Sequence, residues 1–162
     1  MIMQPGFEIL KGKKLAGMRA FMTLSMNRTE DLWRSFMPRR KEIKNIAGSG
    51  LYSVGIYHKN FFTPFNPETE FEKWAAVEVT DVNILPDGMN ALILTEGLYA
   101  VFIHKGPAAE GPGTYDYIFR SWLPGSGFGI DDRPHFAFMG KKYKKDDPAS
   151  EEEIWIPVKP VN

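Results

Sequence analysis

LWRSFMP (residues 32–38) and IFRSWLP (residues 118–124) are two versions of one short pattern. Arg-Ser holds the centre of both copies and proline closes both, while aromatic and aliphatic residues exchange places around them. Apolar runs also surround the two copies at matching distances along the chain. These runs are residues 14–24 and 97–106 before the copies, and residues 50–57 and 136–143 after them. A repeat of this kind predicts two copies of one structural module.

The repeat predicts an α+β fold in which each half reads strand, helix, strand, strand. The last strands are expected at 73–79 and 152–158, and two extra strands, at 7–10 and 89–94, are expected to complete the two halves. The turn sequence LPDG divides the chain into module one (1–86) and module two (87–162) within a single domain. We expect the modules to share one concave antiparallel sheet around a pseudo-two-fold axis. The two main helices then cover one side of the sheet, and a groove forms where the halves meet.

Both predicted helices carry one apolar stripe. In the first helix the stripe contains Leu32, Trp33, Phe36 and Met37, and in the second it contains Tyr115, Ile118, Phe119, Trp122 and Leu123. Asn27 with Glu30 is expected to form a capping box before the first helix, and Thr114 is expected to cap the second. Pro38 is expected to end or kink the first helix, and Pro124 with Gly125 is expected to stop the second.

The composition excludes several classes of protein. The chain has 162 residues, of which 43 % are apolar, and 20 basic residues balance 20 acidic ones. A neutral chain favours no direct nucleic-acid binding. The absence of cysteine excludes disulfides and thiolate chemistry and fits a cytoplasmic protein. The first residues do not resemble a signal peptide, and no apolar run is long enough to span a membrane.

Four stretches make the sequence recognisable when they are taken in order: YAVFIHKGP (99–107), TYDYIFRSWLPGSGF (114–128), RPHFAF (133–138) and EIWIPV (153–158). Together they resemble the GyrI-like small-molecule-binding family, also known as the effector-binding domain of AraC- and MerR-type activators. The resemblance implies two strand-helix-strand-strand (SHS2) modules with a central cleft for drug-like, often lipophilic and cationic compounds. Since the two modules fill the chain, we expect a stand-alone member without a fused DNA-binding domain.

Glu153 is the first candidate for ligand binding. Side chains alternate along a strand, so Glu153 shares one face of the expected strand with Trp155. A carboxylate beside an indole in a cleft suits a lipophilic cation, through charge pairing and cation–π attraction. The alternative is that Glu153 is a solvated strand end within the cluster Glu151-Glu152-Glu153. Relatives often carry a glutamate where this chain has Ala137, and that departure leaves a neutral ligand as an alternative.

Further candidates are a second carboxylate, Glu78, and a set of aromatic residues. Glu78 is alternatively a solvent-facing strand residue. The aromatic candidates for the pocket are Tyr52, Trp74, Tyr117, Phe138 and Phe21, and the helical stripes add Trp33 and Trp122, which are alternatively core residues. Because the three histidines are scattered, we predict no metal site, and we predict no cofactor.

The leading hypothesis is reversible binding of small molecules in an aromatic cleft. The first alternative is hydrolysis of a strained electrophile such as a cyclopropane-bearing natural product, with Glu153 or Glu78 as general base and Tyr52 or Tyr117 as acid. The second is an interaction with gyrase or another protein partner. The sequence identifies no docking surface for such a partner.

Overall fold

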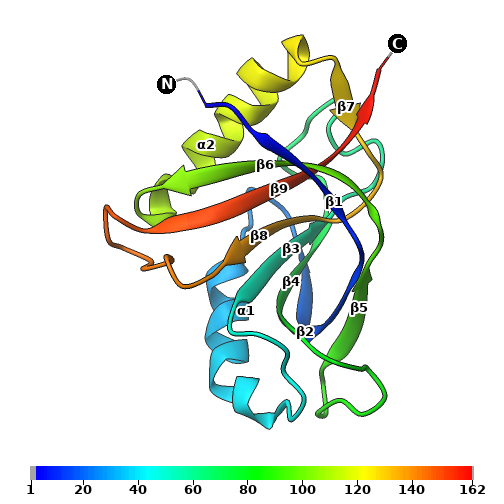
Figure 1. Cartoon of the computed structure of the whole chain (residues 1–162), viewed down its shortest axis with the longest axis vertical. Helices are drawn as coiled ribbons and strands as arrows, with labels where there is room; N and C mark the ends of the chain where they lie inside the picture. Colours follow the sequence, from blue (N-terminus) through cyan, green and yellow to red (C-terminus); the bar gives the residue numbers. More distant parts are fainter. Residues whose placement is uncertain (1–2, 162) are drawn as a thin grey trace.

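A computed structural model describes residues 3–161 of the chain as one curled antiparallel sheet with helices on one side (Figure 1). The strands are β1 (Gly6–Leu10), β2 (Lys13–Met22), β3 (Leu51–Ile56), β4 (Phe71–Glu78), β5 (Asn90–Leu94), β6 (Gly97–Lys105), β7 (Phe128–Ile130), β8 (His135–Met139) and β9 (Glu151–Pro160). The helices are α1 (Thr29–Phe36) and α2 (Gly111–Tyr117). This architecture confirms the predicted α+β class with one concave sheet.

The strand order of the sheet shows how the two halves interlock. Neighbouring strands follow the order β1-β6-β9-β8-β3-β4-β2-β5, and β7 pairs with β9 outside this path. Strands β3 and β8 join the halves at the centre. The expectation that the extra strands each complete their own half is wrong, because β1 pairs with β6 and β5 pairs with β2. Each half thus covers an edge of the other half, which protects strand edges that would otherwise be open.

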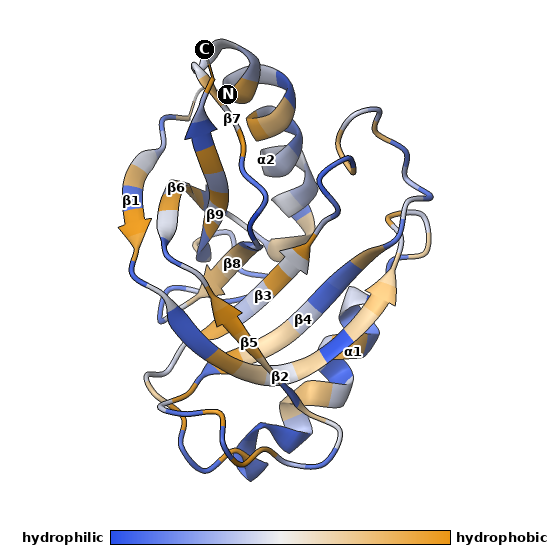
Figure 2. Cartoon of the chain, turned by 90° about the vertical axis from the view of Figure 1, so that its right-hand side faces the viewer, coloured by the Kyte–Doolittle hydropathy of each residue, from blue (hydrophilic) through white to orange (hydrophobic). Residues whose placement is uncertain are grey.

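Strand register divides the side chains between two faces of the sheet. One row across five strands joins Ala75, Ser53, Ala137, Ile154 and Phe102. This row faces the helices, since Ala75 packs with α1 and both Ile154 and Phe102 pack with the helical segment that contains Ile118. The next row along the strands faces the concave side. Figure 2 shows the sheet from the side, curling from β2 and β5 towards β1 and β9.

The two helices bury the apolar stripes that the sequence predicts. Under α1, Leu32 and Phe36 are buried against β2 and β4. Beyond α2, Ile118 is fully buried against β6 and β9. Trp33 and Trp122 are partly buried and pack against the same clusters. These contacts bury apolar surface on this side of the sheet and so stabilise the fold.

The helix ends differ from the predicted caps. Asn27 accepts a hydrogen bond from the Thr29 N–H at 2.9 Å in a local turn, so Glu30 completes no capping box. Thr114 lies inside α2, where its buried hydroxyl is 2.7 Å from Nδ1 of His104. Pro38 ends α1, as predicted, and opens the 3-10 segment Met37–Glu42.

The second helical segment ends at Pro124 and Gly125, as predicted, but its α-helical part ends earlier, at Tyr117. After α2 the chain forms a π-helical turn, Ile118–Trp122, followed by a 3-10 turn, Leu123–Gly125, that contains the expected proline. The short strand β7 follows this turn and pairs with the end of β9. The sequence analysis predicted neither the π-helical turn nor β7, since three residues are too few for a recognisable alternation.

Candidate functional site

A pocket opens on the concave face where the two halves meet. Its volume is about 230 Å³. We call it the concave pocket, and it is lined by Lys13, Tyr52, Phe136, Phe138, Glu153 and Trp155. Four of the ten residues predicted to bind ligand (Tyr52, Phe138, Glu153 and Trp155) therefore lie together in this pocket.

The pairing of three central strands brings these side chains together. Phe138 on β8 lies opposite Tyr52 on β3 and opposite Glu153 on β9. Phe136 lies opposite Trp155 in the neighbouring row. Since residues two apart on a strand share a face, both rows project to the concave side. The pocket thus requires both halves of the chain, because β3 comes from one half and β8 and β9 come from the other.

The aromatic walls of the concave pocket hold one another in defined orientations. The Phe136 and Trp155 rings are stacked, with centroids 5.1 Å apart and planes at 18°. The Tyr52 ring lies 5.0 Å from Phe138 and 5.7 Å from Phe136. The Trp155 indole N–H donates a 2.9 Å hydrogen bond to the Glu153 carboxylate. This bond fixes the carboxylate beside the indole at the mouth of the pocket.

Two carboxylates and one ammonium group set the charge of the site. Burial raises the pKa of the Tyr52 hydroxyl, and the negative charges of Glu78 and Glu153 raise it further. The hydroxyl therefore remains protonated and can donate a hydrogen bond. The Glu78 carboxylate also pairs with the Lys13 ammonium at 3.5 Å, and both side chains are about one-third exposed. Lys13 pairs with Glu78 and not with Glu153, so these three groups together carry one net negative charge.

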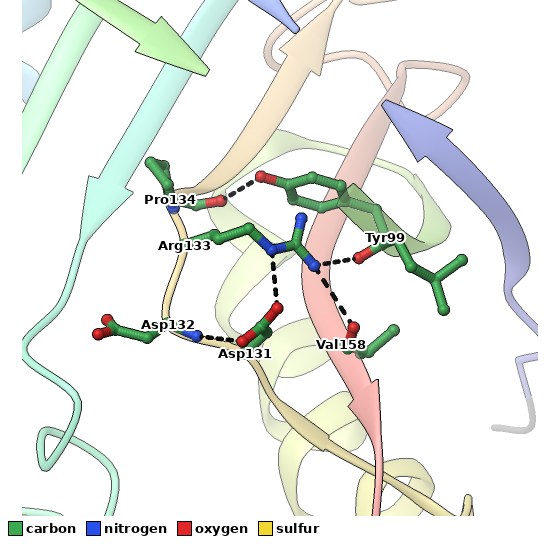
Figure 3. Close-up of polar contacts among 7 residues, drawn as sticks. Tyr99, Asp131, Asp132, Arg133, Pro134 and Val158 are labelled. Carbon is green, nitrogen blue, oxygen red and sulfur yellow. Dashed lines mark hydrogen bonds and ion pairs between the residues drawn. The ribbon is translucent and has the colours of Figure 1, made fainter. Parts of the chain in front are cut away.

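A partly buried arginine, Arg133, supports the rear wall of the concave pocket (Figure 3). The Arg133 guanidinium donates hydrogen bonds to the Asp131 carboxylate at 2.9 Å and to the Leu98 carbonyl at 2.6 Å, and it makes a longer contact with the Val158 carbonyl at 3.4 Å. It also lies over the Tyr99 ring, 4.8 Å from the ring centroid. Its remaining nitrogen, Nη1, is buried with no hydrogen-bond partner among the described residues.

Tyr99 connects the Arg133 network to the aromatic wall of the pocket. Its hydroxyl donates a 2.8 Å hydrogen bond to the Pro134 carbonyl, and burial raises its pKa to about 12 (Figure 3). Its ring packs against Phe136 at 5.4 Å and against Trp155 at 5.6 Å. The Arg133 network therefore holds in place the two stacked rings that form a wall of the pocket.

Three predicted site residues lie on the concave face but do not line the concave pocket. Trp74 lies behind it in the core, 2 % exposed, and its indole nitrogen has no hydrogen-bond partner among the described residues. Glu78 does not line the pocket, but its negative charge acts on the Tyr52 hydroxyl and its carboxylate pairs with Lys13. Phe21 lies near the far end of β2, 58 % exposed.

The other three predicted residues lie on the helix side of the sheet. Trp33 lies within α1, in edge contact with Phe36 at 5.9 Å. Trp122 packs against the buried Phe102 at 5.1 Å. The Tyr117 hydroxyl forms two 3.1 Å hydrogen bonds with the backbone of Met3, one with its N–H and one with its carbonyl. The structure therefore separates Tyr117 from Glu153.

Ala137 also faces the helix side, where it is 5 % exposed. Its neighbours Phe136 and Phe138 project to the opposite face and line the concave pocket. The absence of a glutamate at Ala137 therefore removes no carboxylate from this pocket. The concave pocket keeps its negative charge through Glu153 and Glu78.

The sequence analysis missed Lys13, Phe136, Tyr99 and Arg133. Strand alternation was a usable signal for Phe136, because it lies two residues before Phe138. Lys13 and Arg133 reach the site only through strand register and loop geometry, which the local sequence does not reveal. Within residues 3–161, no group of three or more potential metal-binding side chains occurs, and no helix is long and apolar enough to cross a membrane.

Comparison with known sequences gives one family and one regulator. Residues 3–159 match the family described as the GyrI-like small molecule binding domain. The transcriptional regulator BrlR of Pseudomonas aeruginosa is 26 % identical over 159 residues, which make up 98 % of this chain and 54 % of the regulator. The chain thus spans about half the length of that curated relative.

Comparison with solved structures gives the same fold at low sequence identity. SAV2435 bound to tetraphenylphosphonium aligns with a TM-score of 0.73 and 15 % identity, over 97 % of this chain and 94 % of that one. The EcmrR C-terminal domain aligns with a TM-score of 0.72 and 17 % identity, over 99 % and 100 %. A hydrolase from Listeria innocua aligns with a TM-score of 0.57 and 10 % identity, over 96 % and 92 %.

Proposed function

The chain belongs to the GyrI-like small-molecule-binding family, and on this premise we propose that its concave pocket binds lipophilic, aromatic cations reversibly. The observation that carries the proposal is the Glu153 carboxylate fixed beside the Trp155 indole at an aromatic pocket. The tetraphenylphosphonium bound to SAV2435 supports the proposed class of ligand. The lack of cysteine is consistent with a cytoplasmic protein that meets such compounds after they enter the cell.

The physical chemistry of the site favours a cation over a neutral molecule of the same shape. Glu153 attracts a delocalised positive charge, and the faces of Trp155 and Tyr52 add cation–π attraction. A large cation loses little hydration when it enters an aromatic site. The volume of about 230 Å³ lies below the ~300–1,000 Å³ that usually encloses a drug-sized molecule. We therefore propose that one aromatic arm enters the pocket while the rest of the ligand stays at its mouth.

A thermal-shift experiment with two probes of similar shape tests this proposal. Tetraphenylphosphonium carries a positive charge, whereas triphenylphosphine oxide is neutral. At about one hundred times its dissociation constant, the cation should stabilise the fold by about 2.7 kcal/mol, which raises the melting temperature by several degrees. The neutral probe should raise it much less. Equal shifts with both probes would contradict a cation site.

Substitution of Glu153 tests whether tetraphenylphosphonium binds in the concave pocket. Glu153→Gln should weaken tetraphenylphosphonium binding about tenfold, because it removes the charge and keeps the shape. The matched control is Glu68→Gln, which removes the same charge from an exposed loop. Equal affinity in the Glu153→Gln variant and the wild type would show that the carboxylate plays no part in binding.

A second candidate function is hydrolysis of a strained electrophile, and the position of Tyr52 favours it. Its protonated hydroxyl lies within the influence of two carboxylates, so Glu153 would activate water as a general base while Tyr52 donates a proton to the leaving group. The similarity of the fold to a hydrolase from Listeria innocua adds support. Mass spectrometry of a cyclopropane-bearing substrate tests it: Tyr52→Phe should abolish product formation and Tyr117→Phe should not. No product from the wild-type protein would exclude this activity for that substrate.

A further inference from the structure

A second pocket lies on the helix side of the sheet, at the end of the second helical segment. Its volume is about 460 Å³, twice that of the concave pocket. We call it the N-terminal pocket, because Gln4 and Phe7 form one side and Tyr117, Ser121, Trp122 and Phe128 form the other. Neither function proposed for the concave pocket uses it.

The N-terminal pocket is built around three aromatic rings from separate elements. Trp122 and Phe128 are stacked, with planes at 14° and centroids 6.4 Å apart. Phe7 on β1 lies 5.0 Å from Phe128 and 6.3 Å from Trp122. Behind them the buried Phe102 holds Trp122 in edge contact at 5.1 Å. Phe7 nevertheless remains 47 % exposed, so an apolar ring faces the open pocket.

Two features of the chain shape this pocket. The first is the π-helical turn Ile118–Trp122, which contributes Ser121 and Trp122 to the lining. Single π-helical turns are rare and occur frequently at functional sites. The second is the pair of hydrogen bonds between the Tyr117 hydroxyl and the Met3 backbone. These bonds hold the segment before β1 against the helix, so that Gln4 closes one side of the pocket.

Among the residues that the structure describes, none that lines the N-terminal pocket has a charged side chain. The nearby Arg120 pairs with Asp116 at 2.8 Å on the exposed side of the helix, 80 % and 61 % exposed, so their charges offset each other in solvent. A charged ligand would gain no counter-charge from these side chains, whereas the concave pocket offers a cation the Glu153 carboxylate. The Gln4 amide and the Ser121 hydroxyl supply neutral hydrogen-bonding groups, and Gln4 offers both a donor and an acceptor.

We propose that the N-terminal pocket is a second ligand site, which takes uncharged aromatic molecules that carry a hydrogen-bonding group. Its volume falls within the ~300–1,000 Å³ of small-molecule sites. Its aromatic rings offer stacking surfaces, and its polar rim fixes orientation. Because it lies on the opposite side of the sheet from Glu153, both sites can be filled at once. This proposal does not rest on cation binding in the concave pocket.

N-phenyl-1-naphthylamine is a suitable probe, because it is neutral, aromatic, carries an N–H group and fluoresces more strongly in apolar sites. Titration of the wild-type protein should show saturable binding. The same dissociation constant should be found when tetraphenylphosphonium is present in excess. Displacement of the probe by tetraphenylphosphonium, or the absence of any saturable binding, would overturn the proposal.

A substitution that fills the N-terminal pocket with a side chain tests whether the probe binds there. Gly125 lines the pocket, and a Cβ atom placed there meets no atom within 4 Å, so Gly125→Phe adds a ring without a clash at the backbone. It should weaken probe binding at least tenfold. Gly113→Phe is the matched control, since Gly113 has equal space but lies outside the pocket, and it should leave binding unchanged. Equal binding in wild-type and Gly125→Phe protein would overturn the proposal, and this result does not depend on whether tetraphenylphosphonium binds.

Discussion

The concave pocket and the N-terminal pocket combine the same aromatic residue types with different charge. Each contains a tryptophan stacked on a phenylalanine, Trp155 on Phe136 in one and Trp122 on Phe128 in the other. The concave pocket adds Glu153 and lies where the two halves meet, whereas the described residues that line the N-terminal pocket are uncharged. The two pockets therefore differ in the charged group that strand pairing places beside the rings, and we expect this difference to set the class of ligand that each pocket takes.

The largest expected effect comes from removing each tryptophan in turn. Trp155→Ala should weaken tetraphenylphosphonium binding more than tenfold and leave N-phenyl-1-naphthylamine binding unchanged. Trp122→Ala should do the reverse. Each variant should lose about 3 kcal/mol in the free energy of unfolding, because a large packed side chain is removed. Fluorescence titrations measure the affinities and urea unfolding measures the stabilities. If either variant loses both ligands while it remains folded, the two pockets are not independent.

A smaller effect is expected for the arginine behind the concave pocket. Arg133→Leu removes the donor that serves Asp131 and the Leu98 carbonyl, so we expect a loss of about 2 kcal/mol in the free energy of unfolding. Tetraphenylphosphonium binding should weaken several-fold, because Tyr99 no longer holds Trp155 and Phe136 in place. Arg133→Lys is the control, which keeps the charge and loses the planar fork. An unchanged free energy of unfolding in the leucine variant, measured by urea unfolding, would show that the Arg133 network does not stabilise the fold.

The smallest effect is expected at Lys13, which pairs with Glu78 beside the concave pocket. A ligand cation experiences repulsion from this ammonium group, so Lys13→Met should raise the affinity for tetraphenylphosphonium about threefold. This is the range expected for a partly exposed ion pair, and added salt should reduce the difference. Lys11→Met is the control at an exposed site. Calorimetry that shows equal affinity in wild-type and Lys13→Met protein would exclude such an influence.

Much of the fold was predictable because the repeat carries strong periodic signals. The patterns around Arg34 and Arg120 predicted both helices, and alternation predicted the central strands. The exchange of β1 and β5 between the halves was not predictable, since a short strand contains no signal for its partner. The same limit applies to the pockets: alternation placed Glu153 beside Trp155, but only register places Lys13 near them. Likewise, Tyr117 and Trp122 have the right residue types but project from the helix side.

The most direct test of the central claim is a crystal structure of the chain grown with tetraphenylphosphonium. We expect one phenyl arm within the concave pocket against Trp155 and Tyr52. The phosphorus should lie within about 6 Å of the Trp155 ring centroid, and the Glu153 carboxylate should face the cation. A structure in which the cation occupies the N-terminal pocket, or in which it lies away from Glu153, would contradict the assignment of cation binding to the concave face.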